Sequence, residues 1–156
     1  MINYSHIGGV MIRIFSDPAF REIEQAVLSI PAIDGVEYNT IINDPLPEIL
    51  SYCDIVILKW HPGMAIDDLK KMLRPEAKLV LCVKREEEGK ILPEDFTRLD
   101  DLWIHPFLVE RATLRLTNLA NEILRAREVS LYKGWLETLM DLVPDRIWFK
   151  NLDGVH

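Results

Sequence analysis

The sequence predicts an α/β protein, in which helices cover both faces of a doubly wound, five-stranded parallel sheet and an extended helix follows at the C-terminal end. Short apolar runs alternate with helix-like segments from residue 10 onward, the order expected of repeated strand–helix units. Residues 54–58 and 78–83 are almost continuously apolar, as expected for strands that are buried on both faces of a sheet.

The predicted strands are rich in β-branched residues and are bounded by Gly, Pro, Asn or Asp. They lie at residues 10–15, 36–42, 54–58, 78–83 and 102–105. The connecting segments show helical spacing or begin at a proline. They lie at residues 18–30, 44–52, 66–73 and 93–99. Ser16 or Asp17 is expected to cap the first helix, with Pro18 in its first turn.

A long last helix is predicted at residues 108–142, which contain one glycine and no proline. Its apolar residues recur at alternating intervals of three and four, the pattern of a coiled-coil seam. The predicted dimer seam consists of Val109, Ala112, Leu116, Leu119, Ile123 and Ala126. Up to residue 119, packing of this helix on its own sheet is the alternative. Beyond residue 119 we expect packing against the same helix of a second copy.

Composition narrows the range of functions. The 156-residue chain has a net charge of −7, which disfavours general binding to nucleic acid or to anionic membranes. No signal peptide and no apolar run long enough to span a bilayer is visible, so a cytoplasmic location is expected. Cys53 and Cys82 lie inside apolar runs and are expected to be buried, reduced thiols.

Chemical motifs are scarce. The chain has no phosphate-binding glycine loop and no zinc-ligand spacing, so no catalytic residue, metal or cofactor is predicted. In parallel sheets, function lies at the carboxyl ends of the strands. That rim is predicted to carry Ser16, Asp17, Lys59, Trp60, His61, Val83, Lys84, His105 and Pro106. An α/β ligand-binding or enzymatic site that uses His61, His105 and Asp17 is therefore an alternative function.

Residues 10–110 resemble the receiver domain of response regulators. Four segments carry the resemblance, in the order found in receivers: residues 17–22 after the first strand, residues 54–58 with Pro62-Gly63-Met64, residues 79–83, and His105-Pro106-Phe107. The resemblance implies the receiver strand order 2-1-3-4-5 and assigns residues 1–125 to one domain.

The positions that a receiver uses for phosphorylation are altered in this chain. They are Phe15, Ser16, Asp17, Lys59, Val83 (or Cys82) and His105. Lysine cannot form an acyl phosphate, and Phe15 and Ser16 cannot hold a hard divalent cation, which prefers carboxylate oxygens. The domain is therefore predicted to be a pseudo-receiver, and a receiver phosphorylated at an unusual site is the alternative. Lys59 is expected either to pair with Asp17 or to point into solvent.

Residues 136–156 resemble the opening of a PAS sensory domain, in which a short amphipathic helix precedes Pro-Asp, an apolar strand and an Asp-Gly turn. Residues 143–156 are assigned to this incomplete domain, so we expect the chain to be part of a longer protein. The layout resembles bacterial sensory proteins whose output is a diguanylate cyclase (GGDEF type) or a histidine kinase. The implied function is a dimeric signalling module that relays a signal through its C-terminal helix.

Overall fold

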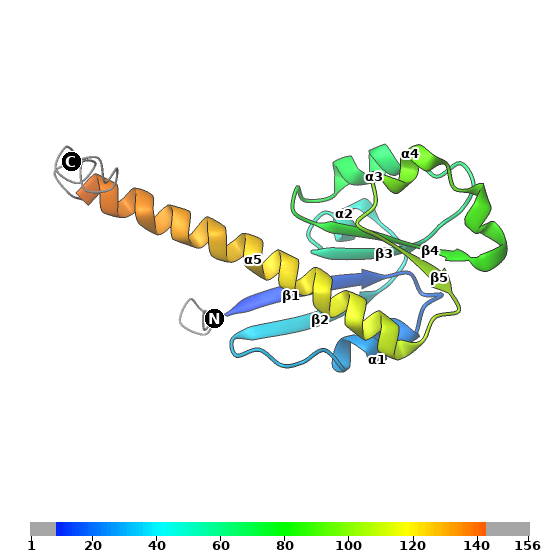
Figure 1. The fold of residues 1–156 in the computed structure, drawn as a ribbon, viewed down its shortest axis with the longest axis horizontal. Helices are drawn as coiled ribbons and strands as arrows, with labels where there is room; N and C mark the ends of the chain where they lie inside the picture. Colours follow the sequence, from blue (N-terminus) through cyan, green and yellow to red (C-terminus); the bar gives the residue numbers. More distant parts are fainter. Residues whose placement is uncertain (1–8, 143–156) are drawn as a thin grey trace. The chain divides into compact units, whose positions relative to one another are not determined.

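A computed structural model describes residues 9–142 of the chain. They form one five-stranded sheet in the order β2-β1-β3-β4-β5, with every neighbouring pair of strands parallel (Figure 1). The strands are β1 (Val10–Ser16), β2 (Val36–Ile42), β3 (Ile55–Lys59), β4 (Lys78–Lys84) and β5 (Asp101–His105). The predicted fold class and strand order are thus confirmed.

The connecting helices are short, and the last helix is long. They are α1 (Glu22–Leu28), α2 (Pro47–Leu50), α3 (Ile66–Met72), the 3-10 helix η2 (Arg85–Lys90), α4 (Pro93–Phe96) and α5 (Val109–Leu142). The length of α5 confirms the predicted helix over residues 108–142.

The prediction for the start of the first helix was wrong. Asp17 Oδ1 accepts a hydrogen bond from the backbone N–H of Ala19 at 3.0 Å, which stabilises a turn ahead of the helix. The helix begins only at Glu22, and the residue at its N-cap, Arg21, makes no side-chain capping bond. Asp17 therefore closes a separate turn and does not cap the helix. An aspartate side chain can do either, because in both cases its oxygen accepts a hydrogen bond from a nearby backbone N–H.

The core has two layers because successive strand side chains point to opposite faces of the sheet. Val56 and Leu58 of β3 belong to one cluster, together with Leu50 of α2 and Ile66 of α3. The alternate β3 residues are equally buried and face the other layer. Figure 1 shows α1 and α5 on that second face and α2, α3 and α4 on the first. The hydroxyl of Thr113 in α5 donates to the carbonyl oxygen of Ala26 in α1 at 3.1 Å, which joins the two helices.

A buried carboxylate holds the amino-terminal side of the sheet together. Asp54, which precedes β3, is 1% exposed. Its side chain accepts hydrogen bonds from the backbone N–H of Arg13 at 2.8 Å and from Arg74 Nη1 at 3.1 Å. Because a buried carboxylate needs such partners, these two hydrogen bonds explain why a charged residue can be buried directly before an apolar strand.

The predicted dimer seam proves to be mainly core. Four of its six residues are almost fully buried within the single chain: Ala112 (2% exposed), Leu116 (0%), Leu119 (5%) and Ile123 (1%). Val109 is half-buried, and only Ala126 is exposed. The four buried residues cannot also meet a second copy, so this part of the prediction is wrong, including the expected partner packing between residues 119 and 123. The spacing misled because intervals of three and four also suit a helix that packs on its own domain.

The chain divides into two compact units, residues 1–123 and residues 124–156. Within the described residues, the second unit is the helical segment 124–142. The predicted beginning of a PAS domain, residues 143–156, lies outside the described residues. No helix among residues 9–142 is long and apolar enough to cross a membrane.

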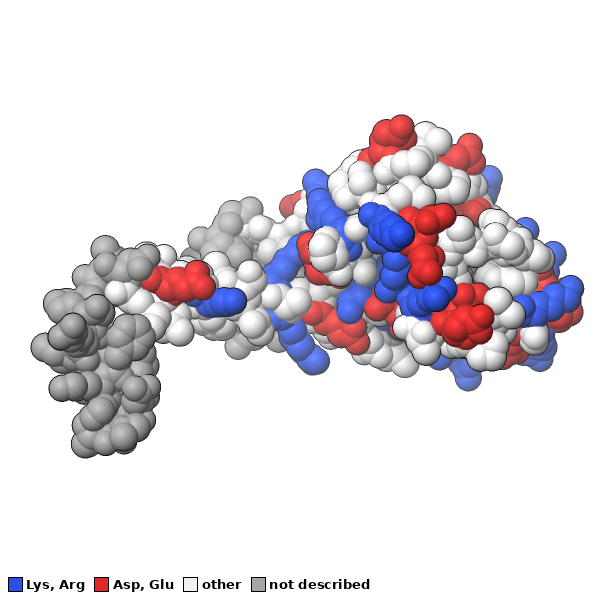
Figure 2. Space-filling model, turned by 90° about the horizontal axis from the view of Figure 1, so that it is seen from above, with Lys and Arg blue, Asp and Glu red and all other residues white. Residues whose placement is uncertain are grey.

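The surface of the first unit mixes both signs of charge. On the face seen in Figure 2, lysine and arginine side chains lie among aspartate and glutamate side chains. One network links Lys78 of β4 to Glu122 at 3.1 Å and to Asp100 at 4.0 Å. Exposed pairs of this kind contribute little to stability, typically up to about 1 kcal/mol each.

Candidate functional site

The carboxyl end of β1 is closed by apolar packing and by backbone contacts. Phe15 and Ser16 are both fully buried. The Ser16 hydroxyl lies within hydrogen-bond distance of two carbonyl oxygens, those of Asp17 at 3.1 Å and Phe20 at 3.4 Å. The backbone N–H of Asp17 donates to the carbonyl oxygen of Ile57 in β3 at 3.0 Å. Phe15 and Ser16 therefore belong to the packed interior of this protein.

Three of the predicted site residues, Lys59, Val83 and His105, line one small cavity at the ends of β3, β4 and β5. Its volume is about 70 Å³. The full lining is Ala19, Phe20, Lys59, Cys82, Val83, Lys84, Glu87 and His105. Such a volume holds a few water molecules and is well below the roughly 300–1,000 Å³ of typical ligand pockets.

His105 is fixed by neighbours that the sequence did not indicate. Its Nε2 lies 4.0 Å from Glu22 Oε1 at the start of α1. Its ring centroid lies 5.4 Å from that of Phe20 and 5.7 Å from that of Phe107. The other carboxyl oxygen of Glu22 is buried and makes no hydrogen bond among the described residues. Glu22 is therefore a functional candidate to which the sequence assigned no role, because it meets His105 only through the fold.

His61 and Asp17, the other two residues of the predicted ligand-binding or enzymatic site, lie outside this cavity. His61 is exposed, and its Nδ1 lies 3.1 Å from the carbonyl oxygen of Pro62. Asp17 holds the turn before α1, and no ion pair joins it to Lys59 in the described part of the chain. The expected Lys59–Asp17 pair is therefore not formed, and Lys59 is exposed at the mouth of the cavity. Across residues 9–142, no three His, Cys, Asp or Glu side chains gather into a metal-binding group.

Both cysteines are buried free thiols, as the sequence predicts. Burial, helped by the neighbouring charge of Asp54, raises the pKa of Cys53 to about 11. Burial likewise raises the pKa of Cys82, which lines the cavity, and the charge of Asp17 adds to the effect. Because the thiolate is the reactive form, neither cysteine is placed to act as a nucleophile near neutral pH.

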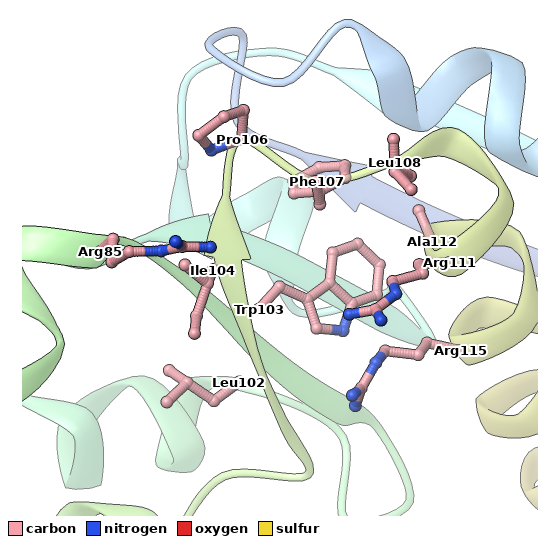
Figure 3. Close-up of a pocket in the computed structure, with 10 residues that line it drawn as sticks. All are labelled: Arg85, Leu102, Trp103, Ile104, Pro106, Phe107, Leu108, Arg111, Ala112 and Arg115. Carbon is pink, nitrogen blue, oxygen red and sulfur yellow. The ribbon is translucent and has the colours of Figure 1, made fainter.

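A larger cleft lies between β5 and the first turns of α5 (Figure 3). Its volume is about 310 Å³. Trp103 and Phe107 line it with three arginines, Arg85, Arg111 and Arg115. Figure 3 shows Arg111 and Arg115 extending from α5, with Arg85 on the opposite side of β5.

One of the three arginines is held in place by Asp101, the first residue of β5. Asp101 Oδ1 accepts a hydrogen bond from Arg115 Nη1 at 2.7 Å, and Asp101 Oδ2 accepts one from Trp103 Nε1 at 2.8 Å. The same carboxylate thereby orients an arginine and the aromatic wall of the cleft. Sequence reasoning missed this cleft because its arginines come from segments 26 residues apart, Arg85 and Arg111, and follow no motif.

Comparison with known proteins gives a fold and no family. No protein-family model and no curated protein matches the sequence. An adenylate cyclase structure from Rhodopirellula baltica aligns with a TM-score of 0.55 at 10% identity, over 80% of this chain and 98% of that one. The structure of NtrX from Brucella abortus, in complex with ADP, aligns with a TM-score of 0.52 at 21% identity, over 85% of this chain and 34% of that one.

A response regulator from Thermotoga maritima aligns with a TM-score of 0.48 at 15% identity, over 71% of this chain and 96% of that one. The adenylate cyclase and NtrX likenesses establish a shared fold, because identities this low carry no function with them. What the protein does must therefore be argued from its own residues.

Proposed function

We propose that this chain is a signal-transduction module in which a receiver-like domain has lost phosphoryl transfer and acts through its C-terminal helix. One observation carries the proposal: β3 ends in Lys59, at the position where the resemblance to receivers places the acceptor aspartate. An ammonium group cannot attack phosphorus to give an acyl phosphate, which requires a carboxylate nucleophile.

The surroundings of Lys59 support the same conclusion. A receiver needs a divalent cation to screen the incoming phosphoryl group, and such a cation prefers carboxylate ligands. Here the corresponding positions are buried Phe15 and buried Ser16. The rim cavity is lined by two lysines, Lys59 and Lys84, together with a single carboxylate residue, Glu87. His105, at the position where the resemblance places a lysine that contacts the phosphoryl group, has its Nε2 4.0 Å from Glu22 Oε1 and is packed among aromatic rings.

The relay part of the proposal rests on α5. The helix begins directly after the rim and continues for 34 residues, past the end of the first unit at Ile123. A change at the rim can be passed along such an element as a shift or rotation. We propose that α5 dimerises with a second copy in the bacterial cytoplasm. It would carry the signal to a PAS domain that begins at residues 143–156, and then to a diguanylate cyclase or histidine kinase output.

The test is incubation of the full chain with acetyl phosphate and Mg²⁺, read by intact mass. We expect no phosphoryl adduct on the native chain, whereas an ordinary receiver treated in parallel gains one. The variant Lys59→Asp restores a carboxylate at the end of β3 and is also expected to remain unlabelled, because Phe15 and Ser16 still provide no cation site. A stoichiometric adduct on the native chain would refute the proposal and favour a receiver phosphorylated at an unusual site.

Binding of a small anion is the second candidate function. It is favoured by the cleft between β5 and α5, whose volume of about 310 Å³ exceeds that of the rim cavity. Arginine forks bind carboxylate or phosphate oxygens in two parallel hydrogen bonds, and the ring of Trp103 offers an apolar wall beside them. The ligand-binding alternative at His61, His105 and Asp17 has less support, because the rim cavity is lined by His105 alone of the three.

A further inference from the structure

The distal part of α5 carries an apolar stripe that the fold leaves uncovered. Five large apolar side chains of the second unit are between 46% and 67% exposed. They are Val129 (67%), Tyr132 (54%), Trp135 (58%), Leu136 (46%) and Leu139 (49%). So many exposed large apolar groups within 11 residues mark a binding surface rather than ordinary solvent exposure.

Four of these residues follow a heptad pattern. Val129, Tyr132, Leu136 and Leu139 are separated by three, four and three residues, which assigns them to the a and d positions of two consecutive heptads. The buried residues Leu116 and Ile123 are seven residues apart, and the next position of that repeat is the polar Ser130. The exposed stripe instead begins at Val129, one residue earlier in the repeat. The stripe that packs on the sheet and the exposed stripe are therefore different surfaces of α5.

We infer that a second copy of this chain covers the stripe, as a parallel, in-register coiled coil. This inference rests on the proposed relay through α5 and names the surface that makes it dimeric. Residue pairing at the edges of the stripe decides for a second copy. With Val129 at a, Glu128 falls at g and Lys133 at the following e position. In a parallel homodimer these two positions lie opposite each other across the interface, so each chain gains an ion pair of opposite charges.

The next pair of edge positions agrees. Trp135 falls at g and Met140 at the following e position, so two large apolar side chains meet across the same interface. An antiparallel arrangement would instead bring g positions together, placing Glu128 near the indole of Trp135, and e positions together, placing Lys133 near Met140. Both edge pairs are thus matched in the parallel arrangement and mismatched in the antiparallel one.

Substitution of one stripe residue tests which face of the helix is used. The dissociation constant of the full 156-residue chain is measured by sedimentation equilibrium, with helix content checked by circular dichroism. Leu136→Asp places a charge at an a position in both copies and is expected to raise the dissociation constant more than about a hundredfold. Thr138→Asp makes the same charge change at a c position and is expected to leave it unchanged. A dimer that survives Leu136→Asp would overturn this interface.

Cysteine cross-linking tests the orientation. Leu136→Cys and Leu139→Cys are expected to form interchain disulfides under mild oxidation, because in-register a and d residues bring their Cα atoms within bonding range. Thr138→Cys is the matched control and should remain reduced. The native Cys53 and Cys82 are buried and do not interfere. Absence of a disulfide at both stripe positions, or an equal yield at Thr138→Cys, would overturn the parallel, in-register arrangement.

The acetyl phosphate assay is independent of these variants. If the native chain is phosphorylated and its dimer depends on the stripe, the proposed loss of phosphoryl transfer is refuted and this inference stands. If the native chain is not phosphorylated and the stripe variants leave the dimer unchanged, this inference is refuted and the proposed loss of phosphoryl transfer stands.

Discussion

Replacing Leu116 by alanine removes a side chain that the coiled-coil interpretation and the structure place in different surroundings. As a seam residue, Leu116 would contact a second copy of the chain. In the structure it is 0% exposed within one chain and lies in the layer where α5 packs on the sheet. The two interpretations therefore predict different losses: affinity between copies in the first case, stability of the fold in the second.

The size of the expected loss follows from burial. Leucine-to-alanine substitutions at fully buried positions cost about 2–5 kcal/mol, because transfer free energy is lost and a cavity remains. For a loss of about 3 kcal/mol in a unit of this size, the melting temperature falls by roughly 10 °C. A loss of about 3 kcal/mol is a large share of the free energy of unfolding of a domain, which is roughly 5–15 kcal/mol. Leu114→Ala on the same helix is the control, since Leu114 is 62% exposed, and its expected cost is below about 0.5 kcal/mol.

The assay combines thermal and urea unfolding of the full chain, followed by circular dichroism at one fixed protein concentration. Fixed concentration matters because dimerisation stabilises the folded state by mass action. We expect Leu116→Ala to lower the melting temperature and Leu114→Ala to leave it almost unchanged. An unaltered melting temperature with a raised dissociation constant for Leu116→Ala would refute the assignment of this residue to the core.

Two further predictions concern the thiols and the cleft. Because the pKa of Cys53 is raised from 9.0 to about 11, the unfolded chain loses this proton first, and stability should fall as pH rises through that window. Cys53→Ala should reduce the slope of melting temperature against pH there, and an unchanged slope would contradict the raised pKa. Phenyl phosphate should shift the NMR signal of the Trp103 indole N–H, and Arg111→Gln should weaken its binding about tenfold. Arg21→Gln makes the same charge change outside the cleft and should leave the binding of phenyl phosphate unchanged. Equal weakening by both variants would argue against a binding site in the cleft.

Much of the fold could be predicted because local patterns and tertiary structure agree. The strand β2 lies at the predicted residues, 36–42, since its flanking turn and its composition both point to a strand. The apolar runs that become β3 and β4 are buried on both faces, as expected of central parallel strands. The start of α1 was less predictable, because Asp17 can cap a helix or close a turn and only the path of the chain decides between them.

The residues that we propose replace a receiver's phosphorylation site could be placed from the sequence because they lie at the ends of strands. Once residues 54–58 are recognised as a strand, the position of Lys59 at the rim follows. The contacts of His105 with Glu22 and Phe20 did not follow, since these residues lie more than 80 positions away in the chain and reach His105 only through the fold. The same is true of the Arg115–Asp101–Trp103 arrangement, in which one carboxylate joins β5 to α5.

The last helix shows most clearly which features the sequence determines and which the tertiary structure decides. By itself, the sequence determined that residues 108–142 are helical and that their apolar residues follow intervals of three and four. It did not determine what those residues touch, because the repeats of 3.5 and 3.6 residues are too close to distinguish over two or three turns. Only the tertiary structure decided that Leu116 and Ile123 belong to the core and that Leu136 and Leu139 are exposed. The physical reason is burial, which depends on where the sheet ends and which no spacing along one helix encodes.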